Sequence, residues 1–264
     1  MGFNYKAAFS RNIGWVTEHE QETLSSKRVA IAGAGGVGGE HLVTLSRLGI
    51  QKFNISDFDE FEIHNFNRQA GAFMSAIGRA KCEVMAEVVK DINPNADVIR
   101  FDDGINASNV DEFLKDVDIY VDSLDFFAID ARILLFKKCE EKNIPVVTAA
   151  PIGMGCAFLC FIPGQMSFEK YFRFNDCKSD TERYAKFMVG LAPALGAASN
   201  LILNPFWGLM SDRLDRRKLM IISQSVMGLA ILVLGILVIN DMVQVWHVLI
   251  LSVIQRMGMS LQRT

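Results

Sequence analysis

The chain of 264 residues lacks the cysteine pairs that build a small metal-binding module. Its five cysteines include no CxxC pair, so their spacing provides no zinc ribbon. Their odd number also argues against a disulfide framework. We therefore expect no bound zinc and a reduced, cytoplasmic environment for the folded part of the chain.

Three other features are missing. No apolar run precedes Lys27, so a secretory signal peptide is not expected. The formal net charge is only -3, which gives no reason to expect DNA as a partner. Charged residues are absent from 187–211, 219–239 and 242–255. This change of composition predicts a first domain over 1–190 and a separate apolar region over 191–264.

Apolar runs alternate with amphipathic segments through the first domain. This order predicts an α/β fold, with a doubly wound, mostly parallel, Rossmann-like sheet and helices on both faces. We expect strands near 27–33, 53–59, 97–101, 118–125 and 144–150, and helices near 36–48, 78–94 and 130–142. The segment "GCAFLCF" at 155–161 also has the character of a strand, on which Cys156 and Cys160 would share one face and be packed.

A glycine-rich turn follows the first expected strand and opens the first expected helix. Glycines there allow a tight turn and a close approach of the backbone to a phosphate, which the N–H groups of the helix N-terminus attract. Acidic residues lie at the end of the second strand, where a ribose hydroxyl would lie. The residues concerned are Gly33, Gly35, Gly36, Gly38, Asp57 and Asp59. Together they predict a nucleotide site; a turn that only packs strand against helix is the alternative.

Three further side chains favour ATP over NAD. Arg68, Lys81 and Asp125 all lie near the sheet edge expected to face a ligand. Two cations and a carboxylate suit a triphosphate with Mg²⁺, whereas a dinucleotide pyrophosphate rests mainly on backbone N–H groups. An NAD(P)-binding oxidoreductase remains the alternative. Each residue also has a structural alternative, namely a surface ion pair, a solvated helix face and a helix cap.

The order and spacing of several motifs in the chain resemble those of a known family. From about residue 9 to residue 172, the chain resembles the ThiF/MoeB/ubiquitin-activating superfamily of adenylyltransferases, and the expected domain extends to 190. The matching motifs are "SRN" at 10–12, "GAGGVGG" at 33–39, "DFDEFEIHNFNRQ" at 57–69, "GRAK" at 78–81, "INP" at 92–94 and "DSLD" at 122–125.

The resemblance implies ATP-dependent AMP transfer to a carboxylate. It assigns the phosphates to Gly36 and its neighbours, the ribose to Asp57, and Mg²⁺ to Asp125. It assigns stabilisation of the developing phosphoryl charge to Asn65, Arg68 and Lys81. It also implies a homodimer, in which Arg11 reaches the phosphates of the partner subunit.

The acceptor stays open at this point. The family usually activates the C-terminus of a ubiquitin-like or sulfur-carrier protein, and a small carboxylate is a second possibility. A subset dehydrates threonylcarbamoyl-adenosine in tRNA without a zinc ribbon, and "NRQ" followed by "GA" favours that subset. Residues 151–172 resemble uncharacterised bacterial ThiF-like proteins. We expect Cys177 to be exposed in its polar surroundings, without a settled catalytic role.

The end of the chain predicts a membrane segment. Residues 219–239 are long enough to cross a bilayer, and the basic stretch 208–218 before them favours the cytoplasmic side. From about 195 to 264 the chain resembles a fragment of a major facilitator superfamily transporter, too short to transport. We therefore expect a composite: a cytoplasmic adenylating domain anchored in lipid by its C-terminal helices. The topology of 187–211 stays open, and a buried apolar helix or a non-enzymatic membrane fragment are the alternatives.

Overall fold

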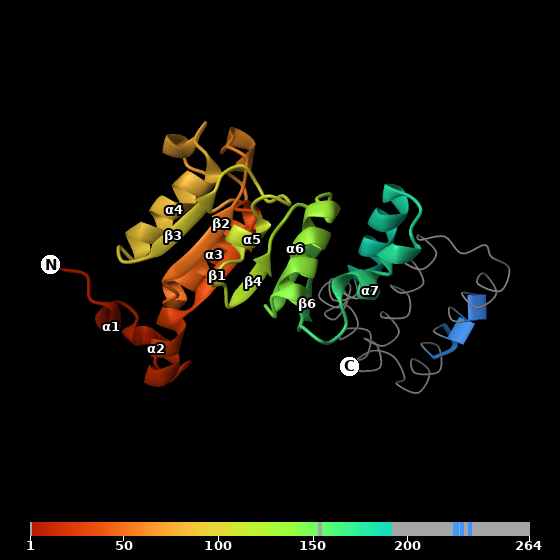
Figure 1. Cartoon of the computed structure of the whole chain (residues 1–264), viewed down its shortest axis with the longest axis horizontal. Helices are drawn as coiled ribbons and strands as arrows, with labels where there is room; N and C mark the ends of the chain where they lie inside the picture. Colours follow the sequence, from red (N-terminus) through yellow and green to blue (C-terminus); the bar gives the residue numbers. More distant parts are fainter. Residues whose placement is uncertain (1, 153–154, 192–223, 227, 230–231, 234–264) are drawn as a thin grey trace, which may run out of the picture. The chain divides into compact units, whose positions relative to one another are not determined.

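A computed structural model of the chain describes residues 2–152, 155–191, 224–226, 228–229 and 232–233 (Figure 1). The described residues contain a six-stranded sheet in the order β3-β2-β1-β4-β5-β6. Its strands are β1 (Arg28–Ala32), β2 (Lys52–Ser56), β3 (Asp97–Phe101), β4 (Ile119–Asp122), β5 (Val146–Ile152) and β6 (Gly155–Phe161). The expected mostly parallel sheet is confirmed, because β3, β2, β1, β4 and β5 pair in parallel.

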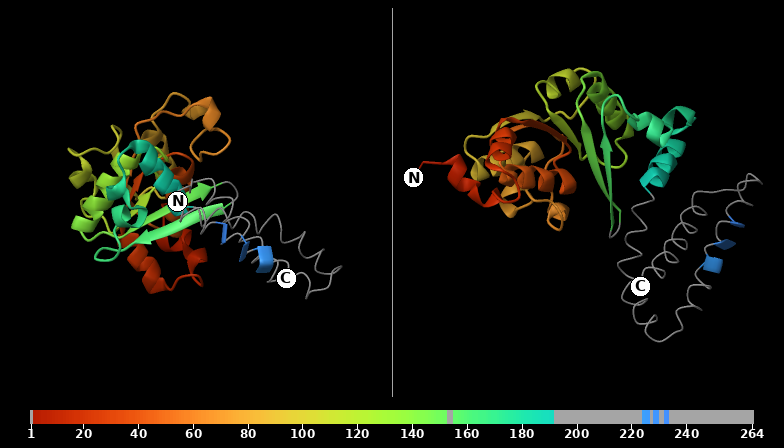
Figure 2. Two further views of the ribbon diagram at one scale, coloured as in Figure 1. Left: turned by 90° about the vertical axis from the view of Figure 1, so that its right-hand side faces the viewer. Right: turned by 90° about the horizontal axis from the view of Figure 1, so that it is seen from below.

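Helices connect the strands as the sequence predicts. They are α1 (Tyr5–Ala8), α2 (Glu18–Ser26), α3 (Gly36–Leu48), α4 (Lys81–Ile92), α5 (Val110–Phe113), α6 (Ile129–Glu141) and α7 (Phe168–Phe172). Short 3-10 turns lie at η1 (Ser10–Asn12), η2 (Ile63–Asn65), η3 (Met74–Ala76) and η4 (Phe174–Asp176). Because the strand order reverses between β1 and β4, right-handed crossovers bring α3 and α4 to one face and α5 and α6 to the other (Figure 2).

Local chemistry sets the ends of these helices. Thr17 and Glu20 form a reciprocal capping box that begins α2. Helix α3 ends where Gly49 takes a left-handed conformation with φ of 103°. Helix α4 ends at Ile92, two residues before Pro94, whose ring disfavours a helical conformation at the residue before it.

The core fills the space between the sheet and its helices. Its largest fully buried side chains come from β1, β2, β4 and the helices beside them; they include Ile31, Leu42, Phe53, Ile55, Phe113 and Tyr120. Burial of these side chains fixes the strand register and so sets which residues meet at the ends of the strands.

The chain divides into two compact units. One comprises residues 1–149 and 159–171, and the other comprises residues 150–158 together with the chain from 172 onward. In the second unit, the rings of Phe172 and Phe174 stack at 5.5 Å, and Phe187 packs edge-on against Phe172 at 4.9 Å. The domain boundary expected at 190 stays a prediction.

Two expectations about cysteine were wrong. Cys156 and Cys160 share a face of β6, but both are exposed, because the alternating positions Ala157 and Phe161 take the buried face. Cys177 is half-buried rather than exposed.

The predicted membrane segments lie outside the described residues, apart from residues 187–191 and a few positions between 224 and 233, which are helical. Within the part of the chain that the structure describes, no helix combines the length and the apolar character that crossing a bilayer requires. The transporter resemblance, the membrane anchor and the topology of 187–211 therefore stay predictions of the sequence.

Two neighbouring glycines of α3 give a test of the turn that precedes this helix. A Cβ at Gly38 would lie 1.7 Å from the carbonyl oxygen of Gly33, whereas one at Gly39 would lie 3.4 Å from the oxygen of Ala34. We expect Gly38→Ala to lower the free energy of unfolding by about 3 kcal/mol or more. Gly39→Ala, the matched control, should change it by less than about 1 kcal/mol. Denaturant unfolding measures both, and equal effects would contradict this account of the turn.

Candidate functional site

The carboxyl ends of three parallel strands meet at one edge of the sheet. Ala32 of β1 is paired with Ser56 of β2 and with Asp122 of β4. The next residue of each strand therefore begins a loop at the same level. Those loops start with Gly33, Asp57 and Ser123, so the register alone brings the glycine turn, the acidic segment and the "DSLD" motif together.

The glycine turn packs closely against the end of β4. Gly33 has a φ of 91°, and a Cβ there would lie 2.2 Å from the carbonyl oxygen of Ser123. Its N–H donates to the oxygen of Ser56 at 2.7 Å. Only glycine fits this position, because both the conformation and the space exclude a side chain. The first N–H groups of α3 are thereby held at the strand ends, as an anion site requires.

Asp57 braces the glycine turn. One carboxylate oxygen accepts the N–H of Ala34 at 2.7 Å, and the other accepts the N–H of Asp59 at 2.9 Å. The residue expected to bind a ribose thus already supports the backbone of the glycine turn. A ribose would use the remaining lone pairs of these two oxygens.

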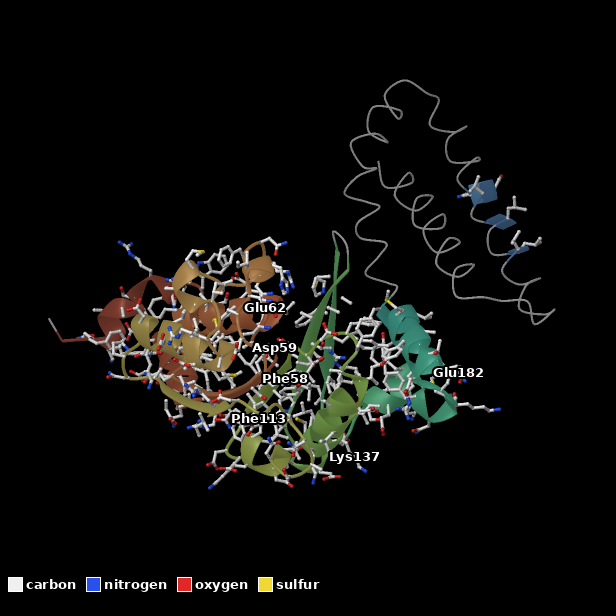
Figure 3. The ribbon with its side chains drawn as sticks, turned by 90° about the horizontal axis from the view of Figure 1, so that it is seen from above. Phe58, Asp59, Glu62, Phe113, Lys137 and Glu182 are labelled. Carbon is white, nitrogen blue, oxygen red and sulfur yellow. The ribbon has the colours of Figure 1, made fainter. Side chains whose placement is uncertain are left out.

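Lys81 is held beside this acidic segment. Its ammonium donates to Asp59 Oδ2 at 2.7 Å, and its backbone N–H donates to the oxygen of Asp59 at 2.9 Å. The Lys81 side chain is 7% exposed. That of Asp59, which Figure 3 labels, is 53% exposed, so the pair is open on the aspartate side. The structural alternative for Lys81, a solvated helix face, is wrong, because Lys81 is a buried cation whose partner Asp59 is half exposed.

Arg68 lies over the glycine turn. A Cβ on Gly36 would come within 3.6 Å of the Arg68 Cγ, while the exposed guanidinium donates to the oxygens of His64 and Asn67 at 3.1 Å. Asn65 is buried beneath the same segment, and its Oδ1 accepts the N–H of Glu62 at 2.9 Å. Asn65 therefore shapes the loop that carries Arg68.

Asp125 begins an exposed turn before α6. Its Oδ1 accepts the N–H of Phe127 at 3.0 Å, so the side chain stabilises a turn before the helix. The structural alternative for Asp125, a helix cap, is wrong, because the N-cap of α6 is Ala128. No group of three potential metal-ligating side chains occurs among the described residues. Magnesium often takes one or two carboxylates together with phosphate oxygens, so Asp125 fits Mg²⁺ only with a nucleotide present.

A buried ion pair that the sequence did not reveal supports the Asp125 turn. Arg132 of α6 donates through Nε to Asp122 Oδ2 at 2.8 Å, and Thr148 donates to the same oxygen at 2.8 Å. Arg132 also donates to the backbone oxygens of Leu124 at 2.7 Å and Asp125 at 3.3 Å. Because both charged side chains are almost fully buried, the pair locks this loop to α6 and β4.

The contact between His41 and Ser123 is a second interaction that the sequence did not indicate. Its Nδ1 lies 3.2 Å from Ser123 Oγ, which joins α3 to the loop after β4. Burial lowers the pKa of His41 below its ordinary 6.5. The imidazole is therefore neutral near pH 7 and adds no charge beside the glycine turn.

Arg11 lies apart from these residues. The side chain of the neighbouring Asn12 donates to the oxygens of Leu48 at 3.1 Å and Arg47 at 3.3 Å, which places the "SRN" turn at the C-terminal end of α3. The glycine turn is at the opposite end of this 13-residue helix, about 20 Å away at 1.5 Å per residue. Arg11 therefore does not join the other predicted residues within one copy of the chain.

The buried cysteines are poor nucleophiles. Burial raises the pKa of Cys82 to about 12 and that of Cys139 to about 12. Neither thiol is ionised at neutral pH, although Cys82 lies next to Lys81.

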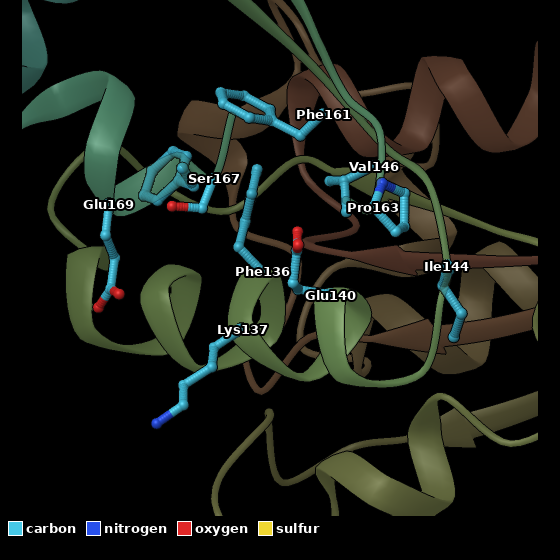
Figure 4. Close-up of a pocket in the computed structure, with 10 residues that line it drawn as sticks. Phe136, Lys137, Glu140, Ile144, Val146, Phe161, Pro163, Ser167 and Glu169 are labelled. Carbon is cyan, nitrogen blue, oxygen red and sulfur yellow. The ribbon is translucent and has the colours of Figure 1, made fainter. Parts of the chain in front are cut away.

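A small pocket lies away from the strand ends that meet at the glycine turn. It is lined by Phe136, Glu140, Val146, Phe161 and Phe168, among others, and opens beside the C-terminal half of α6 (Figure 4). Its walls are mainly aromatic and aliphatic, and the predicted site residues are not among its lining.

The sheet order and the glycine turn at the strand ends define a doubly wound α/β protein. Comparison with known families refines this class: the ThiF family model matches residues 9–248, so the chain belongs to the ThiF family. The match covers most of the tail after residue 195, for which the transporter resemblance has no support.

Individual relatives agree with this assignment. The chain is similar to the tRNA threonylcarbamoyladenosine dehydratase of Bacillus subtilis, at 32% identity over 53% of this chain and 55% of the relative. It is also similar to the SAMP-activating enzyme E1 of Haloferax volcanii, at 33% identity over 49% of this chain and 47% of the relative. The chain thus spans about half the length of the curated relatives it matches.

A solved structure shows the same likeness. The Escherichia coli dehydratase TcdA in complex with ATP is 29% identical, with a TM-score of 0.52 over 54% of this chain and 58% of that chain. PaaA, at 19% identity and a TM-score of 0.57, shares the fold.

The buried ion pair gives a prediction about stability. Arg132→Met leaves the carboxylate of Asp122 buried without its partner, so we expect a loss of about 3–5 kcal/mol in the free energy of unfolding. Arg79→Met removes a half-buried arginine that pairs with Glu83 and Glu87 near the surface, and should cost much less. Urea titrations compare the two variants; equal losses would refute the bracing role of Arg132.

His41 gives a prediction about pH. Its pKa is lower in the folded state than in the unfolded state, so below about pH 6.5 the unfolded chain binds more protons. The contribution of His41 is therefore fully present above pH 6.5 and is lost as the pH falls. His41→Gln should lose less stability than the wild type between pH 7.5 and 5.5. If the pH dependence of stability were the same in His41→Gln as in the wild type, the lowered pKa of His41 would be contradicted.

Proposed function

We propose that the chain activates a carboxylate by transferring AMP to it from ATP. Its ThiF family membership and the ATP complex of a relative at 29% identity support this proposal. The observation that supports the proposal most directly is the buried Lys81 beside the glycine turn. Its ammonium is paired with the exposed Asp59, which a phosphate can replace.

In the proposed reaction, a carboxylate oxygen attacks the α-phosphorus of ATP. The new bond is an acyl phosphate, the bond to the β-phosphate breaks, and pyrophosphate leaves with its electron pair. The substrate carboxylate is already ionised, so no base is needed. Catalysis then consists of alignment and stabilisation of negative charge.

Different residues of the site align the substrates and stabilise the negative charge. The N–H groups at the start of α3 and the guanidinium of Arg68 face the phosphates, and Lys81 leaves Asp59 to neutralise the transferring group. Asp57 binds the ribose, and Asp125 holds the Mg²⁺ that accompanies ATP, which supplies further charge neutralisation. Arg132 and Asn65 position the loops that carry Asp125 and Arg68.

The acceptor is a carboxylate from one of three sources. These are the C-terminus of a ubiquitin-like carrier protein, the carboxylate of a threonylcarbamoyl-modified tRNA nucleoside, and a small carboxylate. The names of the relatives include both a tRNA dehydratase and a SAMP-activating enzyme. A panel of carrier C-termini, modified tRNA and small carboxylates, each tested for an adenylated product, separates these sources.

We further propose that Arg11 acts on the site of a second copy. Its distance from the glycine turn along α3 supports this arrangement, since its own turn is fixed to the far end of the helix. ATP-dependent chemistry also places this domain in the cytoplasm. Lipid anchoring by the C-terminal region is a proposal from composition alone.

Lys81 gives the test of this function. We expect Lys81→Ala to reduce carboxylate-dependent exchange of pyrophosphate into ATP by about 100-fold or more, because charge on the transferring group is left uncompensated. Lys90→Ala, an exposed lysine in the same helix, is the matched control and should keep full activity. Wild-type exchange that is absent with every acceptor, together with NAD(P) binding that survives Lys81→Ala, would instead indicate an oxidoreductase.

A further inference from the structure

The pocket beside the C-terminal half of α6 is separate from the nucleotide site. Its volume is about 140 Å³, and Val146 in its wall begins β5, whereas the glycine turn lies where the parallel strands end. All of its lining residues belong to one compact unit of the chain. An apolar cavity of about 150 Å³ in another protein accepts benzene, so this pocket has room for a six-membered ring.

Aromatic side chains form one wall of the pocket. The rings of Phe136 and Phe168 lie 4.1 Å apart, and Phe161 packs edge-on against both, at 5.3 Å and 5.6 Å. These three side chains are at most 8% exposed, and Ile144 and Val146 beside them are also buried. Protein interiors contain few voids larger than a water molecule, so an open pocket between rings that already pack against one another suits an apolar ligand.

Glu140 gives the pocket a negative charge. Its Oε1 accepts the N–H of Gly164 at 3.1 Å, which fixes the side chain to the turn after β6. This turn is itself ordered, because Gly164 takes a φ of 78° and the N–H of Gln165 donates to the oxygen of Ile162 at 3.1 Å. The second oxygen of the Glu140 carboxylate has lone pairs with which it can accept a hydrogen bond from a ligand.

Carboxylates outnumber the ammonium groups in the lining of the pocket. Glu140 and Glu169 both line it, and Lys137 is the one cationic side chain among the lining residues. Figure 4 shows the carboxylate of Glu140 on the pocket side of α6 and the ammonium of Lys137 turned away from the pocket. The aromatic wall also favours positive charge, because the face of a phenyl ring attracts a cation. The pocket therefore selects an apolar group that carries a positive charge.

We propose that this pocket binds a small organic cation, in which an ammonium group is attached to an aromatic or short branched apolar body. The body packs against Phe136, Phe161 and Phe168, and the ammonium donates to Glu140. Burial of apolar surface stabilises the complex, and the charge-assisted hydrogen bond sets the preference for a cation. No step of the proposed adenylation uses this pocket, so the inference goes beyond the proposed function and does not depend on it.

Binding of benzylamine tests the site, because its ring matches the volume of the pocket and its amine is protonated at pH 7. Methyl NMR spectra of the full-length chain should show saturable shifts of Ile144 and Val146, with a dissociation constant of about 1 mM or below. The methyl groups of Val29 and Ile31, which are buried in β1, are the control and should not shift. Shifts that are absent, that do not saturate, or that are as large in β1 would overturn the proposal.

Glu140→Gln separates the charge of the pocket from its shape. The amide oxygen can still accept the N–H of Gly164, while the negative charge is lost. We expect benzylamine to bind at least about tenfold more weakly to this variant. Benzyl alcohol, which has the same ring without the charge, should bind equally to both proteins, which also shows that the variant is folded. Glu141→Gln, which changes an exposed carboxylate outside the lining, should bind benzylamine like the wild type.

Two results would refute a site for cations. One is equal affinity of benzylamine for Glu140→Gln and for the wild type. The other is tighter binding of benzoate than of benzylamine to the wild type, a comparison that does not require the variant to fold. Neither measurement contains ATP, so a failed pyrophosphate exchange leaves both interpretable.

Discussion

The contact between the glycine turn and the end of β4 is the constraint on which the site depends. A side chain at Gly33 would collide with Ser123, and one at Gly38 would collide with Gly33 itself. These collisions exclude any residue but glycine at positions 33 and 38. In addition, the carboxylate of Asp57, which follows β2, accepts the N–H of Ala34. The N-terminus of α3 is consequently held where three aligned strands end. An anion bound there would meet preorganised N–H groups without further rearrangement of the chain.

Two ion pairs around this turn have different consequences. Arg132 and Asp122 are both buried, so their pairing keeps a loop fixed and costs much to break. Lys81 is buried but its partner Asp59 is half exposed, so a phosphate can compete for the ammonium. The difference in burial therefore distinguishes the structural pair Arg132–Asp122 from the pair Lys81–Asp59, in which the ammonium can change its partner. The neutral His41 keeps additional charge away from the same turn.

Much of the architecture was predictable from the sequence. The glycine turn followed by a regular apolar pattern predicted α3 with its observed bounds, and "DVIRF" predicted β3, since both patterns are local. Contacts that depend on tertiary burial were not predictable. The Asp122–Arg132 pair spans ten positions without a periodic signal, and nothing in the sequence indicated that Asp59 pairs with Lys81. The exposure of Cys156 likewise depends on which face of β6 the core covers.

The central claim is that the glycine turn, the acidic segment and the start of α4 bind one triphosphate. Hydrogen–deuterium exchange of the full-length chain with Mg-ATP tests it most directly, because peptides covering 33–39, 57–69 and 78–85 are read in one experiment. The account predicts that ATP slows exchange in all three segments together, while NAD⁺ leaves them unchanged. Slowed exchange with NAD⁺ instead of ATP, or ATP protection confined to other parts of the chain, would contradict it.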